Sequence, residues 1–263
     1  MLLSKISANE IERYKALEHR RGIGNKTINN RLAVLRRCLN CAREWGCLEA
    51  EPPRIKALKC PSPKTDYLTI EECETLLAHS SGTVRELVLL ALRSGMRQGE
   101  LRGLQWESID WASKVIVVRQ SQCDSAKQLA STKTSRERYV ALSDDVYTLL
   151  AARRQSSGYV FKNSEGRPFR GNLLLQHLHR IQKRAGLRKF GWHMLRHTFA
   201  SQLAVSGTPM RSVQELLGHS TITMTMRYSH VAPENLRAAI NTLPSYRNSE
   251  ILGSRWAMEN SVY

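Results

Sequence analysis

A proline-rich stretch at residues 50–66 constrains the fold of this chain more than any other local feature. Four prolines fall within it: Pro52, Pro53, Pro61 and Pro63. Proline has no backbone N–H and cannot continue a helix or a central strand, so the stretch is expected to link two separate parts. We place a helical domain at 1–49, a larger domain at 67–243 and a C-terminal tail at 244–263.

The part before the linker has the pattern of two amphipathic helices. One is expected over 6–21 and another over 27–45, where apolar residues recur at helical spacing. Four arginines lie on the other side of the second helix: Arg31, Arg36, Arg37 and Arg43. Such a helix can pack inward and contact phosphate outward, so these arginines are candidate DNA-binding residues. An ordinary amphipathic surface helix would show the same pattern.

The balance of charge favours a polyanionic partner. Lysine and arginine number 40 against 23 acidic residues, and the net charge is +17. Nucleic acid is the leading partner for such a surface, with an anionic membrane as the alternative. No apolar run reaches the ~18 residues that a membrane-spanning helix needs, and no signal-peptide pattern opens the chain. We therefore expect no membrane contact and a cytoplasmic, nucleoid-associated protein.

The six cysteines raise the question of a zinc site. Cys38 and Cys41 form a C-x-x-C pair, but both fall within the helix expected over 27–45. Cys47 and Cys60 supply no second pair of this kind. Because nothing indicates secretion, we expect reduced thiols rather than disulfides, and no bound metal.

The part after the linker mixes helices with a few strands. Helices are expected at about 70–79, at 83–94 and from 172 onward, and strands at 108–110, 115–121 and 138–142. A capping box at Thr69 should begin the first of these helices. The fold class that follows is mainly α with a small antiparallel β-sheet.

Two segments of this larger part carry residues suited to phosphate. Arg97 and Glu100 lie in Ser-Gly-Met-Arg-Gln-Gly-Glu-Leu, where one expected helix ends and another begins. Exposed backbone amides at a helix start, together with an arginine, suit an anion. His193 and Arg196 are three residues apart and therefore share a helix face, from which they could bind one phosphate and handle one proton.

A third segment ends in a tyrosine. Gly218 is expected to cap a helix, which places His219 in the following turn and Tyr228 on the next helix. Each of the three segments by itself also has an ordinary structural explanation. An Arg–Glu pair is a common helix salt bridge, and a lone histidine or tyrosine near a core is usually a packing residue.

Taken in order, the segments resemble the tyrosine recombinase (phage integrase) family. The ordered residues are Arg97, Lys133, His193, Arg196, His219 and Tyr228. The string His-Met-Leu-Arg-His-Thr-Phe-Ala resembles the family's second arginine box, and Leu-Leu-Gly-His-Ser begins the box that ends at the nucleophile. The resemblance is strong over 68–240 and looser over 6–60. It implies a tyrosine recombinase catalytic domain preceded by a short helical DNA-binding domain.

The resemblance implies a site-specific recombinase or integrase that cuts duplex DNA with Tyr228 and forms a 3′-phosphotyrosyl intermediate. Arg97 and Arg196 would hold the non-bridging phosphate oxygens and stabilise the transition state. Because ester exchange keeps the bond energy in the protein–DNA link, no cofactor is expected. The expected assembly is a homotetramer on paired sites of double-stranded DNA.

The remaining roles also follow from the resemblance. A phenol with a reference pKa of about 10 needs a proton acceptor, and His193 is the expected base. Lys133 would give a proton to the departing 5′ oxygen, with Lys127 as the weaker candidate. His219 would bond the scissile phosphate, and Glu100 would support the arginine site.

Three other functions fit parts of these observations. A non-catalytic DNA-binding protein would show the same charge but has no need of Tyr228. A type IB topoisomerase shares the chemistry without synapsis of two sites. A metal-dependent nuclease would use histidines such as His177 and His179, but these are not spaced along one helix face and have no nearby acid pair.

Overall fold

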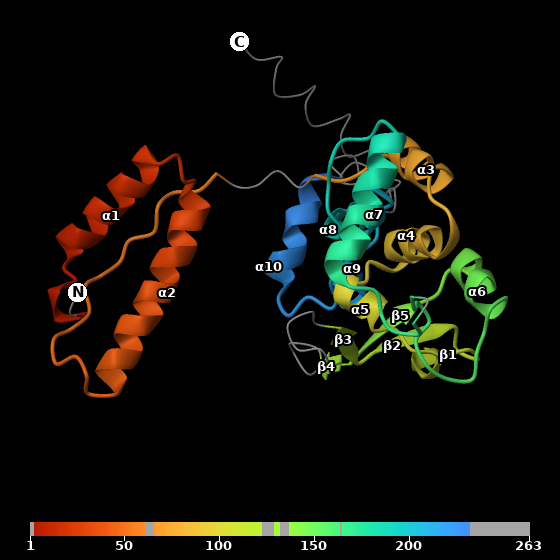
Figure 1. The fold of residues 1–263 in the computed structure, drawn as a ribbon, viewed down its shortest axis with the longest axis horizontal. Helices are drawn as coiled ribbons and strands as arrows, with labels where there is room; N and C mark the ends of the chain where they lie inside the picture. Colours follow the sequence, from red (N-terminus) through yellow and green to blue (C-terminus); the bar gives the residue numbers. More distant parts are fainter. Residues whose placement is uncertain (1–2, 62–65, 123–128, 132–136, 164, 232–263) are drawn as a thin grey trace, which may run out of the picture. The chain divides into compact units, whose positions relative to one another are not determined.

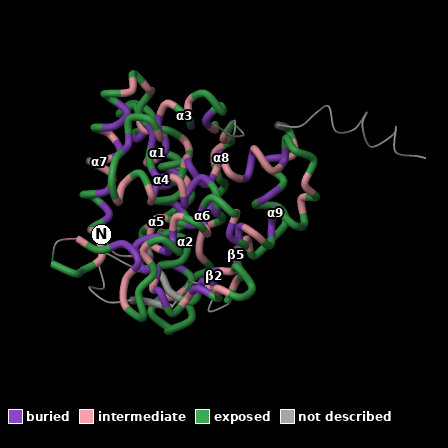
Figure 2. Tube along the Cα trace, turned by 90° about the vertical axis from the view of Figure 1, so that its right-hand side faces the viewer, coloured by how far each residue is buried: buried purple, intermediate pink, exposed green. Residues whose placement is uncertain are grey.

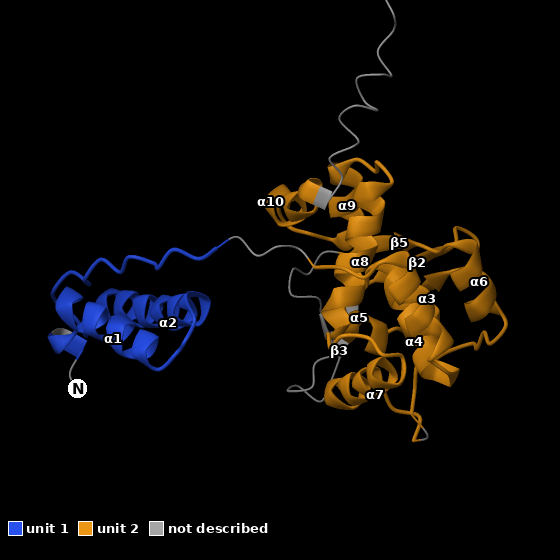
Figure 3. Cartoon of the chain, turned by 90° about the horizontal axis from the view of Figure 1, so that it is seen from above, with its two compact units in different colours: residues 1–64 blue, residues 65–263 orange. Residues whose placement is uncertain are grey.

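The computed structural model describes residues 3–61, 66–122, 129–131, 137–163 and 165–231. The chain forms two compact units, residues 1–64 and 65–263 (Figures 1 and 3). The tail predicted at 244–263 lies outside the described residues.

The first unit contains the two predicted helices. A short 3-10 turn, η1 (Leu3–Lys5), precedes α1 (Ala8–Arg20) and α2 (Asn25–Glu44). Ser7 caps α1, because its hydroxyl accepts the backbone N–H of Glu10 at 3.2 Å. The apolar faces of the two helices meet in a small buried cluster that includes Ile11, Ile28, Leu32 and Leu39.

Part of the segment predicted as a linker packs against this unit. Residues 50–60 form neither helix nor strand, but Ile55 is buried in the cluster of the two helices. The side chain of Asn29 bonds both the carbonyl and the N–H of Leu58, each at 2.8 Å, and Arg36 donates to the carbonyl of Ile55 at 2.5 Å. Side chains of α2 thus satisfy the backbone groups that helix or sheet would satisfy elsewhere.

The second unit is mostly helical. Its helices are α3 (Ile70–Ala78), α4 (Gly82–Ser94), α5 (Gln98–Arg102), α6 (Asp144–Ala151), α7 (Gly171–Arg184), α8 (Trp192–Val205), α9 (Met210–Leu217) and α10 (Ile222–Thr225), with 3-10 turns η2 (Trp106–Ser108) and η3 (Met226–Val231). The predicted capping box is present at the start of α3. The hydroxyl of Thr69 accepts the N–H of Glu72, whose carboxylate accepts the N–H of Thr69.

A small antiparallel sheet completes the second unit. Strands β1 (Ile109–Asp110), β2 (Val115–Val118) and β5 (Arg138–Ala141) lie in the order β1-β2-β5, and β3 (Gln120–Gln122) pairs separately with β4 (Leu129–Ser131). Ile116 pairs with Val140 in the register of β2 and β5, and both side chains are buried. Tyr139, which precedes Val140 on β5 and points to the other face, is 63% exposed. The predicted fold class is therefore confirmed.

The core of the second unit positions the segments that carry the candidate residues. Leu87, Leu90 and Ala91 of α4 and Leu195 of α8 are buried in its main cluster. Figure 2 colours the trace by how far each residue is buried. A smaller cluster joins α8, α9 and η3, and it contains Ala200, Ala204, Val213, Leu217 and Tyr228. Among the described residues, no helix combines the length and apolarity needed to cross a membrane.

Candidate active site

The first arginine segment folds around a buried carboxylate. Helix α4 ends at Gly95, whose φ of +60° is the left-handed conformation that ends many helices. Arg97 then precedes α5, and Glu100 lies in the first turn of that helix with 2% of its surface exposed. The carboxylate of Glu100 accepts the backbone N–H of Arg97 at 2.7 Å and its guanidinium at 2.9 Å. This ion pair fixes the orientation of the Arg97 side chain. The side chain is 44% exposed and so remains accessible.

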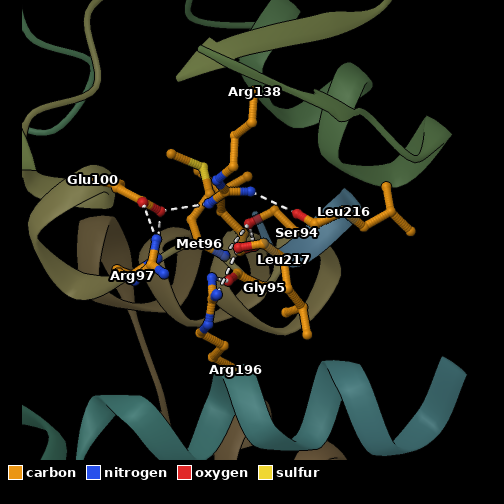
Figure 4. Close-up of polar contacts among 10 residues, drawn as sticks. Ser94, Gly95, Met96, Arg97, Glu100, Arg138, Arg196, Leu216 and Leu217 are labelled. Carbon is orange, nitrogen blue, oxygen red and sulfur yellow. Dashed lines mark hydrogen bonds and ion pairs between the residues drawn. The ribbon is translucent and has the colours of Figure 1, made fainter. Parts of the chain in front are cut away.

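A second guanidinium binds the same carboxylate from the sheet. Arg138 of β5 donates to Glu100 at 2.5 Å and to the carbonyl of Leu216, in the last turn of α9, at 2.6 Å (Figure 4). Burial raises the pKa of Glu100, but Arg138 and Arg97 more than offset this, and the net pKa lies below its usual value. Glu100 is therefore a charged group that joins β5 to the segment of Arg97.

Arg196 ties together the ends of two helices. It projects from α8, is 2% exposed, and donates to the carbonyls of Gly95 and Leu217, both at 2.6 Å (Figure 4). These carbonyls belong to the C-terminal ends of α4 and α9, where a cation is electrostatically favoured. Burial first, and then the nearby Arg97 and Arg138, lower the pKa of Arg196 to about 9.

Gly218 and His219 continue from that helix end. Gly218 caps α9 with a φ of +63°, as predicted. A Cβ atom at this position would lie 2.4 Å from Cδ of Arg138, so the close approach also requires glycine. The His219 ring places Nδ1 2.9 Å from the hydroxyl of Thr225. Burial first, and then Arg196 and Arg97, lower the pKa of His219 to about 4, so the ring is neutral at pH 7.

These segments border one open cleft. Its volume is about 1010 Å³, and Arg97, Arg138 and His219 are among its lining residues, together with Glu100 and Ser220. Two guanidiniums and a neutral imidazole can donate hydrogen bonds to a single anion. The cleft is thus suited to a phosphate group.

Tyr228 lies inside the fold beside this cluster and is not one of the cleft-lining residues. It is 1% exposed, and its hydroxyl is 2.7 Å from Nδ1 of His197. Burial raises the pKa of Tyr228, and Arg196 and Arg227 offset this only in part. The phenol is therefore neutral in this structure.

The structure places His197, rather than the predicted base His193, against the phenol. His193 is exposed and contacts the His197 ring edge to face, with 4.5 Å between ring centroids. Burial, followed by His193 and Arg227, lowers the pKa of His197 to about 4. The sequence signal for His197 was its position four residues after His193, which puts both rings on one helix face.

Arg138 is the other residue that the sequence prediction missed. It shares a strand face with the buried Val140, two residues along β5. An arginine on the inner face of a strand needs a buried partner, and this pattern could have indicated the ion pair with Glu100.

Several predicted residues stay outside this cluster or outside the described part of the chain. Lys133 and Lys127 belong to residues that the structure does not describe. In the first unit, Arg31 pairs with Glu18, Arg43 lies 3.3 Å from Glu51, and Arg36 binds the carbonyl of Ile55. These arginines and Arg37 are exposed. Their role in DNA binding stays a prediction.

The described side chains offer no clustered metal ligands. The described residues contain no group of three or more His, Cys, Asp or Glu side chains placed to hold a metal ion. The cysteines in the described part are free thiols: Cys38, Cys41, Cys47, Cys60 and Cys73.

Comparison with known proteins gives the family of this chain. The model of the phage integrase family matches residues 66–235. The chain belongs to the phage integrase family. It is 29% identical to the tyrosine recombinase XerC-like protein of Caldanaerobacter subterraneus subsp. tengcongensis, over 92% of this chain and 72% of that protein. It is 30% identical to the integrase of Escherichia phage P2, over 91% of this chain and 66% of the phage protein.

A solved structure shows the same fold. The Tn1549 transposon integrase, in complex with a circular intermediate DNA, is similar with a TM-score of 0.77 and 22% identity, over 91% of this chain and 86% of that one. The family relationship confirms the predicted enzyme class, the DNA strand transferases of site-specific recombination. The chain spans about two thirds of the length of the phage P2 integrase.

Proposed function

We propose that this chain breaks and rejoins duplex DNA through Tyr228. One observation carries the proposal. Arg97, Arg196, His219 and Tyr228 come from separate segments, yet they meet around one guanidinium: Arg97 and Tyr228 both act on the pKa of Arg196, and Arg196 in turn lowers the pKa of His219. Binding alone would need the cations but not a tyrosine held beside them.

In the proposed reaction the Tyr228 oxygen attacks the phosphorus and displaces the 5′ oxygen of the next nucleotide. The phenolic proton passes to the proposed base, His193, as the new phosphotyrosyl bond forms, and the 5′ oxygen takes up a proton, for which Lys133 is the proposed donor. Attack of a 5′ hydroxyl on the phosphotyrosine reverses these steps and rejoins the strand. Since every bond broken is replaced by an equivalent bond, no nucleotide cofactor is required.

The donors for the transition state are set before the substrate arrives. Each terminal nitrogen of Arg196 gives one N–H to a backbone carbonyl and keeps a second for a phosphate oxygen. We assign the Thr225 hydroxyl as donor to Nδ1 of His219, 2.9 Å away. The neutral ring then carries its proton on Nε2, which can donate to the same phosphate. Fixed donors of this kind stabilise the charge of the transition state without reorganising during the reaction.

Double-stranded DNA is the proposed partner. The chain carries a net charge of +17, and residues 171–190, which include α7, hold five lysines and arginines and no acidic residue. We extend the proposal to a homotetramer on paired sites and to association with the nucleoid.

A nicked suicide substrate tests the proposal. The protein is incubated with a pool of short random-sequence duplexes, each nicked so that cleavage releases a short fragment that carries the free 5′ hydroxyl and diffuses away. Wild type should form a covalent adduct, resistant to denaturant, on the peptide that contains Tyr228. Tyr228→Phe should form none, because the ring remains but the nucleophilic oxygen is gone. An equal yield of adduct from Tyr228→Phe contradicts the proposal, and salt-sensitive binding without adduct favours a non-catalytic DNA-binding protein.

A further inference from the structure

The hydroxyl of Tyr228 is engaged inside the protein. It lies 2.7 Å from Nδ1 of His197, and the two rings are tilted by 52° with 5.8 Å between their centroids. Both groups are neutral at pH 7, since burial raises the pKa of the phenol and lowers that of the imidazole to about 4. A neutral phenol is the better donor of the two. We therefore assign Tyr228 as donor and Nδ1 of His197 as acceptor, with the imidazole proton on Nε2.

The same tyrosine anchors the segment that carries it. Within residues 226–230, Tyr228 alone is buried, while Met226, Arg227 and His230 are exposed. The segment is the 3-10 helix η3, whose hydrogen bonds have poorer geometry than those of an α-helix. The packing of the Tyr228 ring against Ala200, Ala204 and Val213 and its bond to His197 therefore hold η3 to α8 and α9.

We propose that His197 is a positioning residue for the nucleophile: its Nδ1 holds the Tyr228 hydroxyl within the fold, and attack on DNA requires this hydrogen bond to be exchanged for a position at the phosphate. Release of the phenol then also releases η3 from α8, because Tyr228 is both the nucleophile and the residue that anchors η3. This inference rests on the proposed function, in which Tyr228 is the nucleophile.

The geometry favours this role over that of a proton acceptor during attack. Tyr228 is 1% exposed and is not one of the cleft-lining residues, so the observed contact with His197 belongs to the enzyme before attack. An imidazole with a pKa of about 4 is also a weak base for a phenol whose pKa is raised above 10. Loss of the His197 acceptor should therefore make the phenol more reactive rather than less.

Acetylation by N-acetylimidazole tests the restraint in the full chain without DNA. The rate of acetylation of each tyrosine is measured by peptide mass spectrometry in wild type, His197→Phe and His197→Asn. Phenylalanine keeps the shape of the ring without an acceptor, whereas asparagine places its side-chain oxygen near the position of Nδ1. A neutral hydrogen bond corresponds to roughly a 2- to 10-fold change, so Tyr228 should react that much faster in His197→Phe and at the wild-type rate in His197→Asn. Tyr139, which is exposed, provides the internal standard for an unchanged fold.

Nicked DNA supplies the second measurement. At saturating substrate, the rate constant of adduct formation should rise by a similar factor in His197→Phe and return to the wild-type value in His197→Asn. Equal acetylation of Tyr228 in wild type and His197→Phe would overturn the inference, as would slower adduct formation in His197→Phe with Tyr139 unchanged. If no variant forms an adduct, the proposed function fails, whereas the acetylation rates still decide whether His197 restrains the phenol.

Discussion

The two sides of the candidate active site are held in different ways. On the phosphate side, Glu100 is buried between Arg97 and Arg138, and Arg196 binds the ends of two helices. On the nucleophile side, the hydroxyl of Tyr228 makes one hydrogen bond among the described residues, to His197, and its segment is a single 3-10 helix. The donors for the phosphate are thus fixed in advance by charged contacts. The attacking group is held by apolar packing and one neutral hydrogen bond.

The difference follows from what each side must do. Charges that stabilise a transition state are most effective when they do not reorganise, and buried ion pairs and helix ends provide that rigidity. A nucleophile that must reach the phosphate only after the protein has bound DNA can be held by a contact weaker than a buried ion pair.

Replacement of Glu100 by Gln should have the greatest effect. It leaves Arg97 and Arg138 without their shared carboxylate, next to Arg196. Removing one partner of a buried ion pair costs about 3–5 kcal/mol, so the free energy of unfolding should fall by that amount in urea titrations. A loss below about 1 kcal/mol, as for a surface pair, would show that the phosphate side is not rigidly held.

Replacement of Arg196 by Lys keeps the positive charge but removes the planar guanidinium with its paired N–H donors. A lysine cannot bind the carbonyls of Gly95 and Leu217 and also present two donors to a phosphate. We expect adduct formation on nicked DNA to slow by about 10²–10³-fold, the usual effect of losing one transition-state donor. Circular dichroism provides the control for folding. A lysine variant with nearly the wild-type rate would mean that charge alone suffices.

Acidification should destabilise the protein through its half-buried histidines. Since the folded-state pKa of His197 is about 4 and that of an unfolded histidine is about 6.5, the unfolded chain takes up a proton as pH falls through this window and the folded chain does not. Stability therefore decreases from pH 6.5 to 4, by up to about 3 kcal/mol for this residue at 1.36 kcal/mol per pKa unit. Urea titrations of wild type and His197→Asn across the window measure the difference. Identical pH slopes would show that His197 is not held neutral.

Replacement of Gly218 by Ala should have a smaller effect on stability and a local effect on activity. The left-handed conformation costs a residue with a Cβ about 1–2 kcal/mol, and the new atom would press on Cδ of Arg138. We expect slower adduct formation because Arg138 is displaced from Glu100. Gly186→Ala is the matched control, since Gly186 has a φ of +66° and open space around its Cβ position. Equal effects of the two substitutions on adduct formation would contradict a role for the Arg138 contact.

Much of the fold could be predicted from the sequence because it depends on local spacing. The helices that became α1 and α2 follow from apolar residues at helical intervals, and the capping box at Thr69 and the cap at Gly218 follow from single residue types. The packing of residues 50–60 on α2 could not be predicted in this way. Proline predicts where regular structure stops, but not what the chain contacts afterwards.

The sequence by itself determined the family and the order of the candidate residues, since these depend on residue types and their intervals along the chain. The tertiary structure decided which side chains meet. Tyr228 contacts His197 across 31 positions, and Arg138 binds Glu100 across 38 positions and Leu216 across 78. The physical reason is that periodicity reports which face of an element is buried, whereas a hydrogen bond between distant elements depends on how those faces pack.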